Sequence, residues 1–287
     1  MAKKPLTPEQ AEIKAIKKAR RGENAIRFFA FLLAVVITVA TVFIAKGQAE
    51  KAAANAGGDT VTETTTKPVE AEGEKVDDVA ATLEIVNKAT ADAVKASYKW
   101  ARTSEYVDPI DVGSATSILN GVIQGIDKNS DLNSVVGGFL GIGNKEGTVT
   151  AGAAEEGVKE DYLLKAMSLT ESDVSSLAKD GDTYNIVIKD CANVKKDGSN
   201  SLSRVTNDFI THEEVVDGIS SFTTAIQVTS SDVQFSAIQV SATIVEGKLT
   251  NLVIKYHFKA TLNLKVGLSI TGKGSADYSM TYSEIAY

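Results

Sequence analysis

Few residue types in this chain could perform catalysis or bind a metal, and their spacing suits neither task. The two histidines, His212 and His257, form no HExxH pair, and the single cysteine, Cys191, has no evident histidine or basic partner. Zinc sites and zinc proteases need such ligands at short, fixed spacings. His257 alternates with Lys255 and Lys259 and reads as a solvated strand residue. We therefore expect no metal, no cofactor and no catalytic residue.

Two further patterns resemble catalytic motifs but lack their context. Ser176 and Lys179 have the Ser-x-x-Lys spacing of penicillin-interacting enzymes, yet they fall in a predicted hairpin and no Lys-Thr-Gly follows. Paired carboxylates such as Glu155-Glu156 and Glu213-Glu214 lie in polar segments, where a solvated charge is the ordinary interpretation. Spacing alone cannot identify a glycosidase pair. The sequence thus argues against an enzyme.

The uncharged run Phe28–Ala45 would determine on which side of a membrane each other part of the chain lies. Its 18 residues would span roughly 27 Å as a helix, close to the hydrocarbon core of a bilayer. We predict a single transmembrane helix that acts as an uncleaved signal anchor. The alternative is a cleaved signal peptide with a site at Ala54-Asn55-Ala56, but the apolar run exceeds the usual length and that site lies well beyond it.

Charge predicts the orientation of this helix. Residues 1–27 carry eight Lys and Arg against three Glu, whereas the segment after the apolar run is acidic. The positive-inside rule places the N-terminus in the cytoplasm and the C-terminal domain outside, at the cell membrane. Four basic residues next to the membrane would contact anionic lipid headgroups: Lys17, Lys18, Arg20 and Arg21. The acidic remainder argues against nucleic-acid binding.

Composition and periodicity divide the rest of the chain. Residues 1–27 predict a cytoplasmic basic helix, 28–45 the spanning helix, 46–75 a disordered linker and 76–287 an extracellular α+β domain. In that domain Asp77–Arg102 predicts a helix of about 25 residues, capped by Asp77 or Asp78. Residues 114–143 predict a second helical region, whose Gly137–Gly143 end is either an apolar cover over the core or a mobile lid.

From residue 162 onward the apolar period changes to two. The Asp-Gly at 180–181 predicts a hairpin, and the spacing of Thr211 and Glu214 predicts a capping box. The last 55 residues predict three long antiparallel strands, with a bulge where the phase shifts between Phe235 and Ile238. On the apolar face, Gly272 and Gly274 remove side chains where a helix or ligand could approach.

Three segments carry a resemblance: ATLEIVNKATADAVKASYKW, DVSSLAKDGDTYNIVI and VSATIVEGKLTNLVIKYHFKATLNL. Together with the anchor and linker, they resemble uncharacterised membrane-anchored exported proteins of Gram-positive, clostridia-like bacteria. The resemblance covers most of residues 77–287 and implies a location, with no established activity. A long helix cradled by curved strands is also similar to lipid-binding folds of the bacterial lipoprotein-carrier type.

The predicted architecture is thus a long curved antiparallel sheet packed on a long helix. The first functional expectation is a non-enzymatic surface module in envelope structure or partner binding. The alternative is a carrier or sensor of an apolar, lipid-like ligand held between sheet and helix. Its expected contacts are Phe139, Leu140, Tyr256, Phe258, Gly272 and Gly274.

Overall fold

The structure is a computed structural model that describes residues 69–287, except for 114, 118–119, 121–123, 125–127, 223–226 and 267. The helices of this part are α2 (Val79–Ala93), α4 (Leu132–Leu140) and α5 (His212–Phe222), with 3₁₀ turns at Glu160–Tyr162, Glu171–Asp173 and Leu202–Arg204. The strands are β1 (Glu74–Lys75), β2 (Ser97–Asp111), β3 (Lys145–Thr150), β4 (Ala153–Ala154), β5 (Val174–Asp180), β6 (Thr183–Ile188), β7 (Cys191–Ala192), β8 (Gln227–Val245), β9 (Lys248–Val266) and β10 (Leu268–Ala286).

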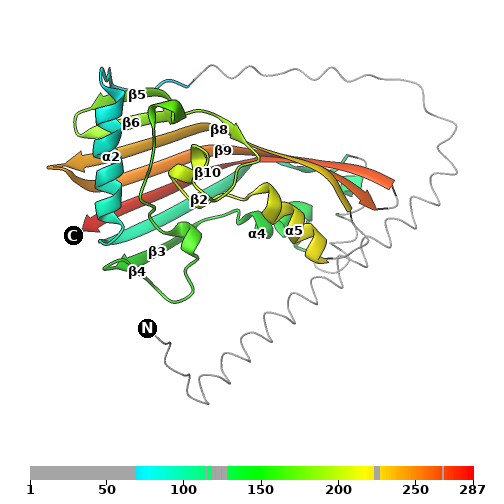
Figure 1. Ribbon diagram of the computed structural model, residues 1–287. Coiled ribbons are helices and arrows are strands. Elements are labelled where there is room, and N and C mark those ends of the chain that lie inside the picture. Colours follow the sequence, from blue (N-terminus) through cyan, green and yellow to red (C-terminus); the bar gives the residue numbers. More distant parts are fainter. Residues whose placement is uncertain are drawn as a thin grey trace, which may run out of the picture.

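All ten strands belong to one antiparallel sheet in the order β1-β5-β6-β8-β9-β10-β2-β3-β4, with β7 beside β8 (Figure 1). Strands β8, β9 and β10 have 19 residues each and follow one another as a meander. Their length lets several elements pack along one face. The strands at both ends of the order, β1 and β4, have two residues each, and such short edges discourage pairing with other chains.

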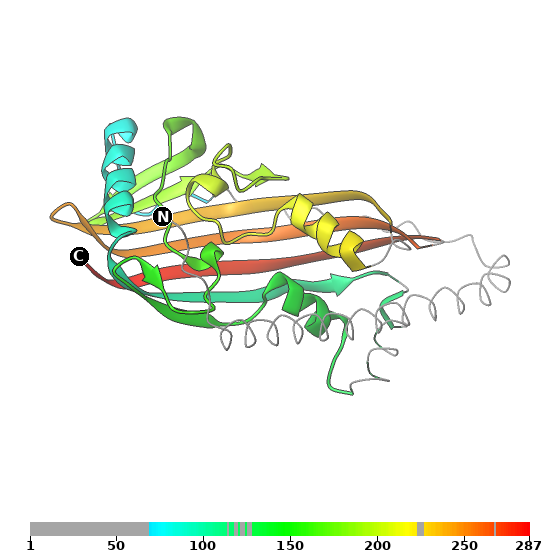
Figure 2. The same cartoon turned by 60° about the horizontal axis from the view of Figure 1, so that its bottom comes forward.

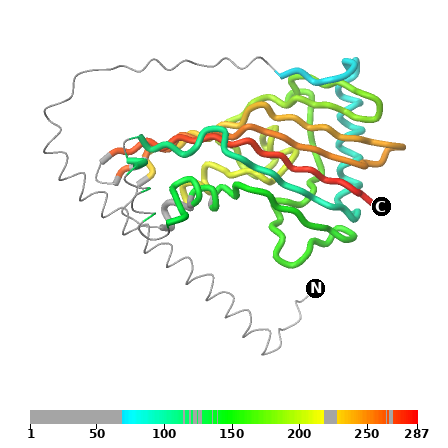
Figure 3. The backbone as a smooth tube through the Cα atoms, turned by 180° about the vertical axis from the view of Figure 1, so that it is seen from behind, coloured from blue at the N-terminus to red at the C-terminus, as the bar shows by residue number. Residues whose placement is uncertain are grey.

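One face of the sheet carries the core. Helix α2 crosses this face near one end and buries Leu83 and Val86, while coil segments and α5 cover it further along (Figure 2). Alternate residues of β9, among them Leu252 and Ile254, point into this core. The residues between them face the other side, which Figure 3 shows from behind with α2 on the far side of the strands. The sheet therefore has one buried face and one open face, as antiparallel sheets often do.

The predicted helix over Asp77–Arg102 is only partly correct. Asp78 caps α2 as expected, because its Oδ1 accepts a hydrogen bond from Ala81 N at 2.9 Å. The helix ends at Ala93, however, and Ser97–Asp111 forms strand β2. Tyr98, Trp100 and Arg102 are buried at every second position, which is a strand period. The helical interpretation failed because Ser97 and Trp100 also continue a three-to-four-residue stripe.

The three long antiparallel strands predicted at the C-terminal end are confirmed as β8, β9 and β10. The expected bulge lies in β8, where the pairing with β9 shifts register between Ser236 and Gln239. Ala237 in the bulge has a positive φ of 50°. The capping box is also present: Glu214 N donates to Thr211 Oγ1 at 3.0 Å, and Thr211 N donates to Glu214 Oε2 at 2.9 Å. It opens α5, which extends to Phe222.

The overall α+β prediction is wrong. The described chain is mostly one large antiparallel sheet, and helices α2, α4 and α5 have 15, 9 and 11 residues. A long helix does not cover the long strands, because α2 spans only about 22 Å and lies across them. The core is completed instead by 3₁₀ turns and loops, in which Tyr162, Leu202 and Phe209 are buried.

The prediction of a single-pass membrane protein with a signal anchor is also corrected. Within the described ranges, no helix is both long enough and apolar enough to cross a membrane. The run Phe28–Ala45 itself lies outside the described residues, as do the basic residues next to it and most of the 46–75 linker. The domain boundaries, the location and the lipid contact of those basic residues stay predictions.

Candidate functional site

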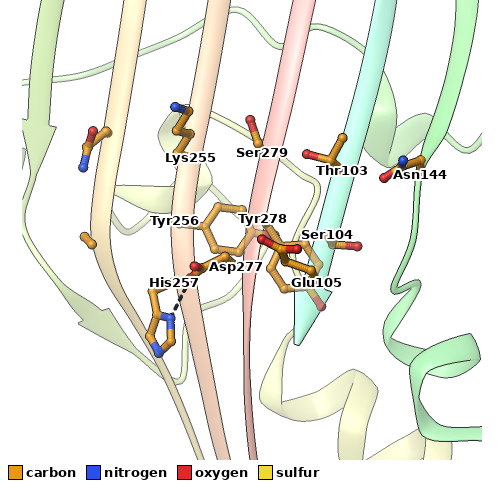
Figure 4. Close-up of a pocket in the computed structure, with 12 residues that line it drawn as sticks. Thr103, Ser104, Glu105, Asn144, Lys255, Tyr256, His257, Asp277, Tyr278 and Ser279 are labelled. Carbon is orange, nitrogen blue, oxygen red and sulfur yellow. Dashed lines mark hydrogen bonds and ion pairs between the residues drawn. The ribbon is translucent and has the colours of Figure 1, made fainter. Parts of the chain in front are cut away.

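A groove of about 500 Å³ crosses the open face of the sheet (Figure 4). Four neighbouring strands contribute its polar lining in two cross-strand rows. The first row is His257 on β9, Asp277 on β10 and Glu105 on β2. The second row is Gln239 on β8, Lys255 on β9, Ser279 on β10 and Thr103 on β2. Asn144 also lines the groove.

The β8 bulge helps to shape the groove. Ala237, which lines it, lies in the left-handed region and donates its N–H to Asp190 Oδ1 at 3.2 Å. A bulge of this kind bends its strand and re-aims the neighbouring side chains, and bulges are common next to binding sites. Small side chains at Ala237, Ser279 and Thr103 leave room between the longer charged ones. The open face is therefore hollowed here.

The charges in the first row are unbalanced. Asp277 pairs with His257 on one side, with His257 Nδ1 2.8 Å from Asp277 Oδ1. On its other side Asp277 lies directly opposite Glu105, and Figure 4 shows the two carboxylates close together. Like charges directly opposite each other on neighbouring strands destabilise a sheet. Glu105 has no ion pair among the described residues that would offset this repulsion.

The first row also contains the residue types of a serine-hydrolase triad, because Ser236 lies opposite His257 on β8. The arrangement lacks the geometry of a triad. Among the hydrogen bonds of the described residues there is none between Ser236 and His257, and the Asp277 side chain is 57% exposed. A triad needs an orienting carboxylate that is buried and a base within reach of the nucleophile. His257 and Asp277 act here as a surface pair.

The residues that the structure describes are equally unsuited to binding a metal ion. Across the described part of the chain, no group of three His, Cys, Asp or Glu side chains is placed to hold a metal ion. Cys191 is half-buried, and burial raises the pKa of its thiol, which keeps it protonated. His212 lies in the first turn of α5, where it contacts Ser231.

Three of the residues predicted to contact an apolar ligand, Leu140, Tyr256 and Phe258, lie on the opposite, buried face. Tyr256 stacks on Tyr278 with ring centroids 5.0 Å apart, and Phe258 contacts the same tyrosine edge-on. Leu140 accepts a hydrogen bond from Tyr278 Oη through its carbonyl at 3.2 Å. Burial raises the pKa of Tyr256 and Tyr278, so both remain neutral donors. These three predicted residues thus form one aromatic core cluster.

The two glycines are not brought into that cluster. Gly272 and Gly274 lie further along β10, where side chains from the end of β2 cover them. Phe139 belongs to α4, and its side chain lies outside the described part. Sequence reasoning missed the groove residues Glu105, Lys255 and Asp277, because each reads as an ordinary solvated position of a half-buried strand. Only the cross-strand register brings their charges together.

No protein-family model matches the chain, and comparisons with curated proteins and with solved structures find no match either. The resemblance to exported proteins of clostridia-like bacteria therefore stays a prediction.

Proposed function

We propose that this protein is a non-enzymatic binding module that uses the open-face groove to hold a basic side chain of a partner protein. The observation that carries the proposal is the pair Glu105 and Asp277, two carboxylates directly opposite each other, of which Asp277 pairs with His257 on its other side. A lysine or arginine placed between them would remove the repulsion that the free protein bears.

The groove has a suitable size and chemistry for such a contact. Its volume of about 500 Å³ accommodates one long side chain and its flanking backbone. Lys255 in the second row would repel a partner segment that carries only positive charges. It would pair with a carboxylate on a segment that also carries the basic side chain. The site therefore favours a mixed-charge segment, and rim charges of this kind govern specificity and association rate more than affinity.

The apolar-carrier alternative has less support. The slot that it requires over Gly272 and Gly274 is occupied by Val112 and Ile110 of this chain. The groove has Lys255 and Asp277 in its lining, and a second cavity, on the buried face, has Arg102 and Asp208 in its lining. An acyl chain gains free energy only from apolar surface, so neither cavity suits it.

Site-specific photo-crosslinking tests the proposal. A photoreactive phenylalanine analogue would replace Ser279 in the full chain, in the cells that produce it. The matched control position is Ser283, on the same face of β10 but outside the groove lining. We expect one discrete adduct from position 279, none from position 283, and loss of the adduct when Glu105→Lys is added.

Equal adducts from both positions, or an adduct that survives Glu105→Lys, would contradict the assignment of the groove. The folded state of each variant is checked by its thermal unfolding, because Glu105 is exposed and its replacement leaves the core intact. Absence of any adduct at position 279 would count against partner binding at this face.

A further inference from the structure

A second cavity, of about 240 Å³, lies on the buried face of the sheet, and a buried arginine forms its floor. Arg102 extends from β2 with 3% of its surface exposed. Its Nε donates to Asp208 Oδ2 at 2.7 Å, and its Nη1 donates to Gly141 O at 2.6 Å and to Ser104 Oγ at 3.0 Å. These bonds hold the guanidinium plane in a fixed orientation.

The remaining nitrogen, Nη2, has no such partner. Among the hydrogen bonds of the described residues, none involves Arg102 Nη2. Among the described residues, Trp100 Nε1 is the only side-chain nitrogen or oxygen that is both inaccessible to solvent and without a hydrogen-bond partner. Arg102 Nη2 is therefore not sealed in the core, and Arg102 lines the cavity, where its guanidinium also lies against the Tyr278 side chain. A donor that reaches the cavity without a protein acceptor leaves an interaction for a ligand to make.

The rim of the cavity carries both signs of charge. Lys196 bridges Asp161 at 3.2 Å and Glu214 at 2.8 Å. Lys159 is exposed and forms no ion pair among the described residues, with its Nζ 6.0 Å from the Tyr162 ring centroid. With Arg102 and Asp208, the cavity has three cationic and three anionic side chains. This balance admits one added negative charge next to Arg102, whereas two would meet stronger repulsion from the three carboxylates.

We propose that this cavity binds the carboxylate group of a small organic acid. Arg102 Nη2 donates to one carboxylate oxygen, and Lys159 at the mouth attracts the same charge. Tyr162 and Phe209 line the walls and would contact a short apolar stem. The site lies on the other face of the sheet from the open-face groove, and Tyr278 is the residue that both linings share.

The ordinary structural interpretation is that Arg102 and Asp208 form a buried ion pair and nothing more. A buried pair is weak grounds for function, because apolar residues often replace one without loss of stability. The access of Nη2 to the cavity, without a protein acceptor for it among the described residues, distinguishes the two interpretations. A purely structural arginine would direct all of its N–H groups at protein acceptors.

The chain contains one tryptophan, and it lies next to this site. The Trp100 ring is 5.1 Å from the ring of Tyr162, which in turn lies 5.6 Å from the Arg102 guanidinium and lines the cavity. Acetate titrated into the full chain, with sodium chloride lowered to keep ionic strength constant, is thus reported by Trp100 fluorescence. We expect a saturable change with acetate and a weaker response to inorganic phosphate.

Two rim variants move the affinity in opposite directions. Asp161→Asn removes a carboxylate and should tighten acetate binding by about two- to fivefold, whereas Lys159→Gln should weaken it by about the same factor. Lys248→Gln, an exposed lysine far along the chain that contacts Tyr287, is the matched control and should leave the affinity unchanged. The proposal is overturned if acetate produces no saturable change beyond that of a sodium chloride titration. It is also overturned if the wild type and the three variants bind acetate with equal affinity.

Discussion

The side chain of Ile110 lies directly over Gly274. A Cβ atom at position 274 would be 2.5 Å from Ile110 Cδ1, and one at position 272 would be 3.3 Å from Val112 Cγ1. The absence of side chains on β10 therefore lets the end of β2 fold its own apolar residues over the sheet. The close approach that these glycines predicted is real, and the group that approaches belongs to the neighbouring strand.

Gly274→Ala should destabilise the protein by about 1–3 kcal/mol, because the new methyl group forces Ile110 out of its place. The matched control is Gly138→Ala in α4, where a Cβ would meet nothing within 4 Å. Alanine is favoured over glycine in a helix, so the control should be neutral or stabilising by up to about 1 kcal/mol. Chemical denaturation of both variants checks this, and equal stability would show that Ile110 yields without cost.

The hairpin between β5 and β6 supports a second prediction. Gly181 lies at φ 55°, and nothing lies within 4 Å of the position of its missing Cβ. Gly181→Val should therefore lower the free energy of unfolding through backbone strain alone, by roughly 1 kcal/mol or more. Gly181→Asn should cost less, because asparagine tolerates the left-handed region. Equal melting temperatures for the two variants would contradict this explanation.

The elements predicted well are those whose signal lies within a few consecutive residues. The alternation in Leu252–Val266 fixes both the strand and its buried face, and the phase shift before Ile238 locates the bulge. The turn at 180–181 was nearly right: Asp180 pairs with Thr183, so Gly181 and Asp182 are the two central residues. Each depends on local backbone preference, which a sequence displays directly.

The features missed depend on contacts between distant segments. Arg102 and Asp208 are 106 residues apart, and nothing near either position predicts their pairing. Glu105 and Asp277 meet only because β2 adds to the edge of β10, and β2 itself was misread as the end of a helix. The groove follows from strand order, and the Arg102 site follows from a loop that brings Asp208 over the sheet; local periodicity encodes neither.

The pair Glu105 and Asp277 predicts a conflict between stability and binding. Glu105→Gln removes the like-charge contact and should stabilise the free protein by about 0.2–1 kcal/mol. The same change should weaken the photo-crosslink at position 279, since one carboxylate of the proposed site is lost. Thr103→Gln, one row away in the same groove, is the control and should alter stability little. A destabilising Glu105→Gln would mean that Glu105 has a structural partner.

Asp173 predicts a dependence of stability on pH. Burial would raise the pKa of this carboxyl, but hydrogen bonds from Thr170 and the Arg204 guanidinium, at 2.6 Å, outweigh burial and lower it. A carboxylate with a lowered pKa in the folded state stabilises that state above its unfolded pKa of about 3.9, and this contribution is lost as pH falls through the lowered value.

Asp173→Asn should thus cost about 1–3 kcal/mol at pH 7, and the difference from the wild type should narrow below about pH 4. Urea denaturation at about pH 7, 5 and 3 measures that difference. Asp197 is exposed, and its carboxylate accepts a hydrogen bond from Ser199 N. Asp197→Asn is therefore the control and should have a smaller effect. A difference that stays constant with pH would rule out the ionised carboxylate as its cause.

The buried pair of Arg102 and Asp208 gives the last prediction. Burial raises the pKa of Asp208, and Arg102, 2.7 Å away, opposes that rise. Arg102→Leu would leave the Asp208 carboxyl buried without its partner and should destabilise by about 3–5 kcal/mol. Asp208→Leu should cost a similar amount, because the guanidinium then loses its counter-charge.

The double variant Arg102→Leu with Asp208→Leu should recover most of that loss, since neither charge remains buried and the new side chains fill similar volume. A thermodynamic cycle over the four proteins, from chemical denaturation, gives the coupling between the two residues. Additive losses would show that each side chain contributes independently. Recovery of stability without recovery of the acetate-dependent Trp100 signal would separate the role of the pair in folding from the ligand site proposed at Arg102 Nη2.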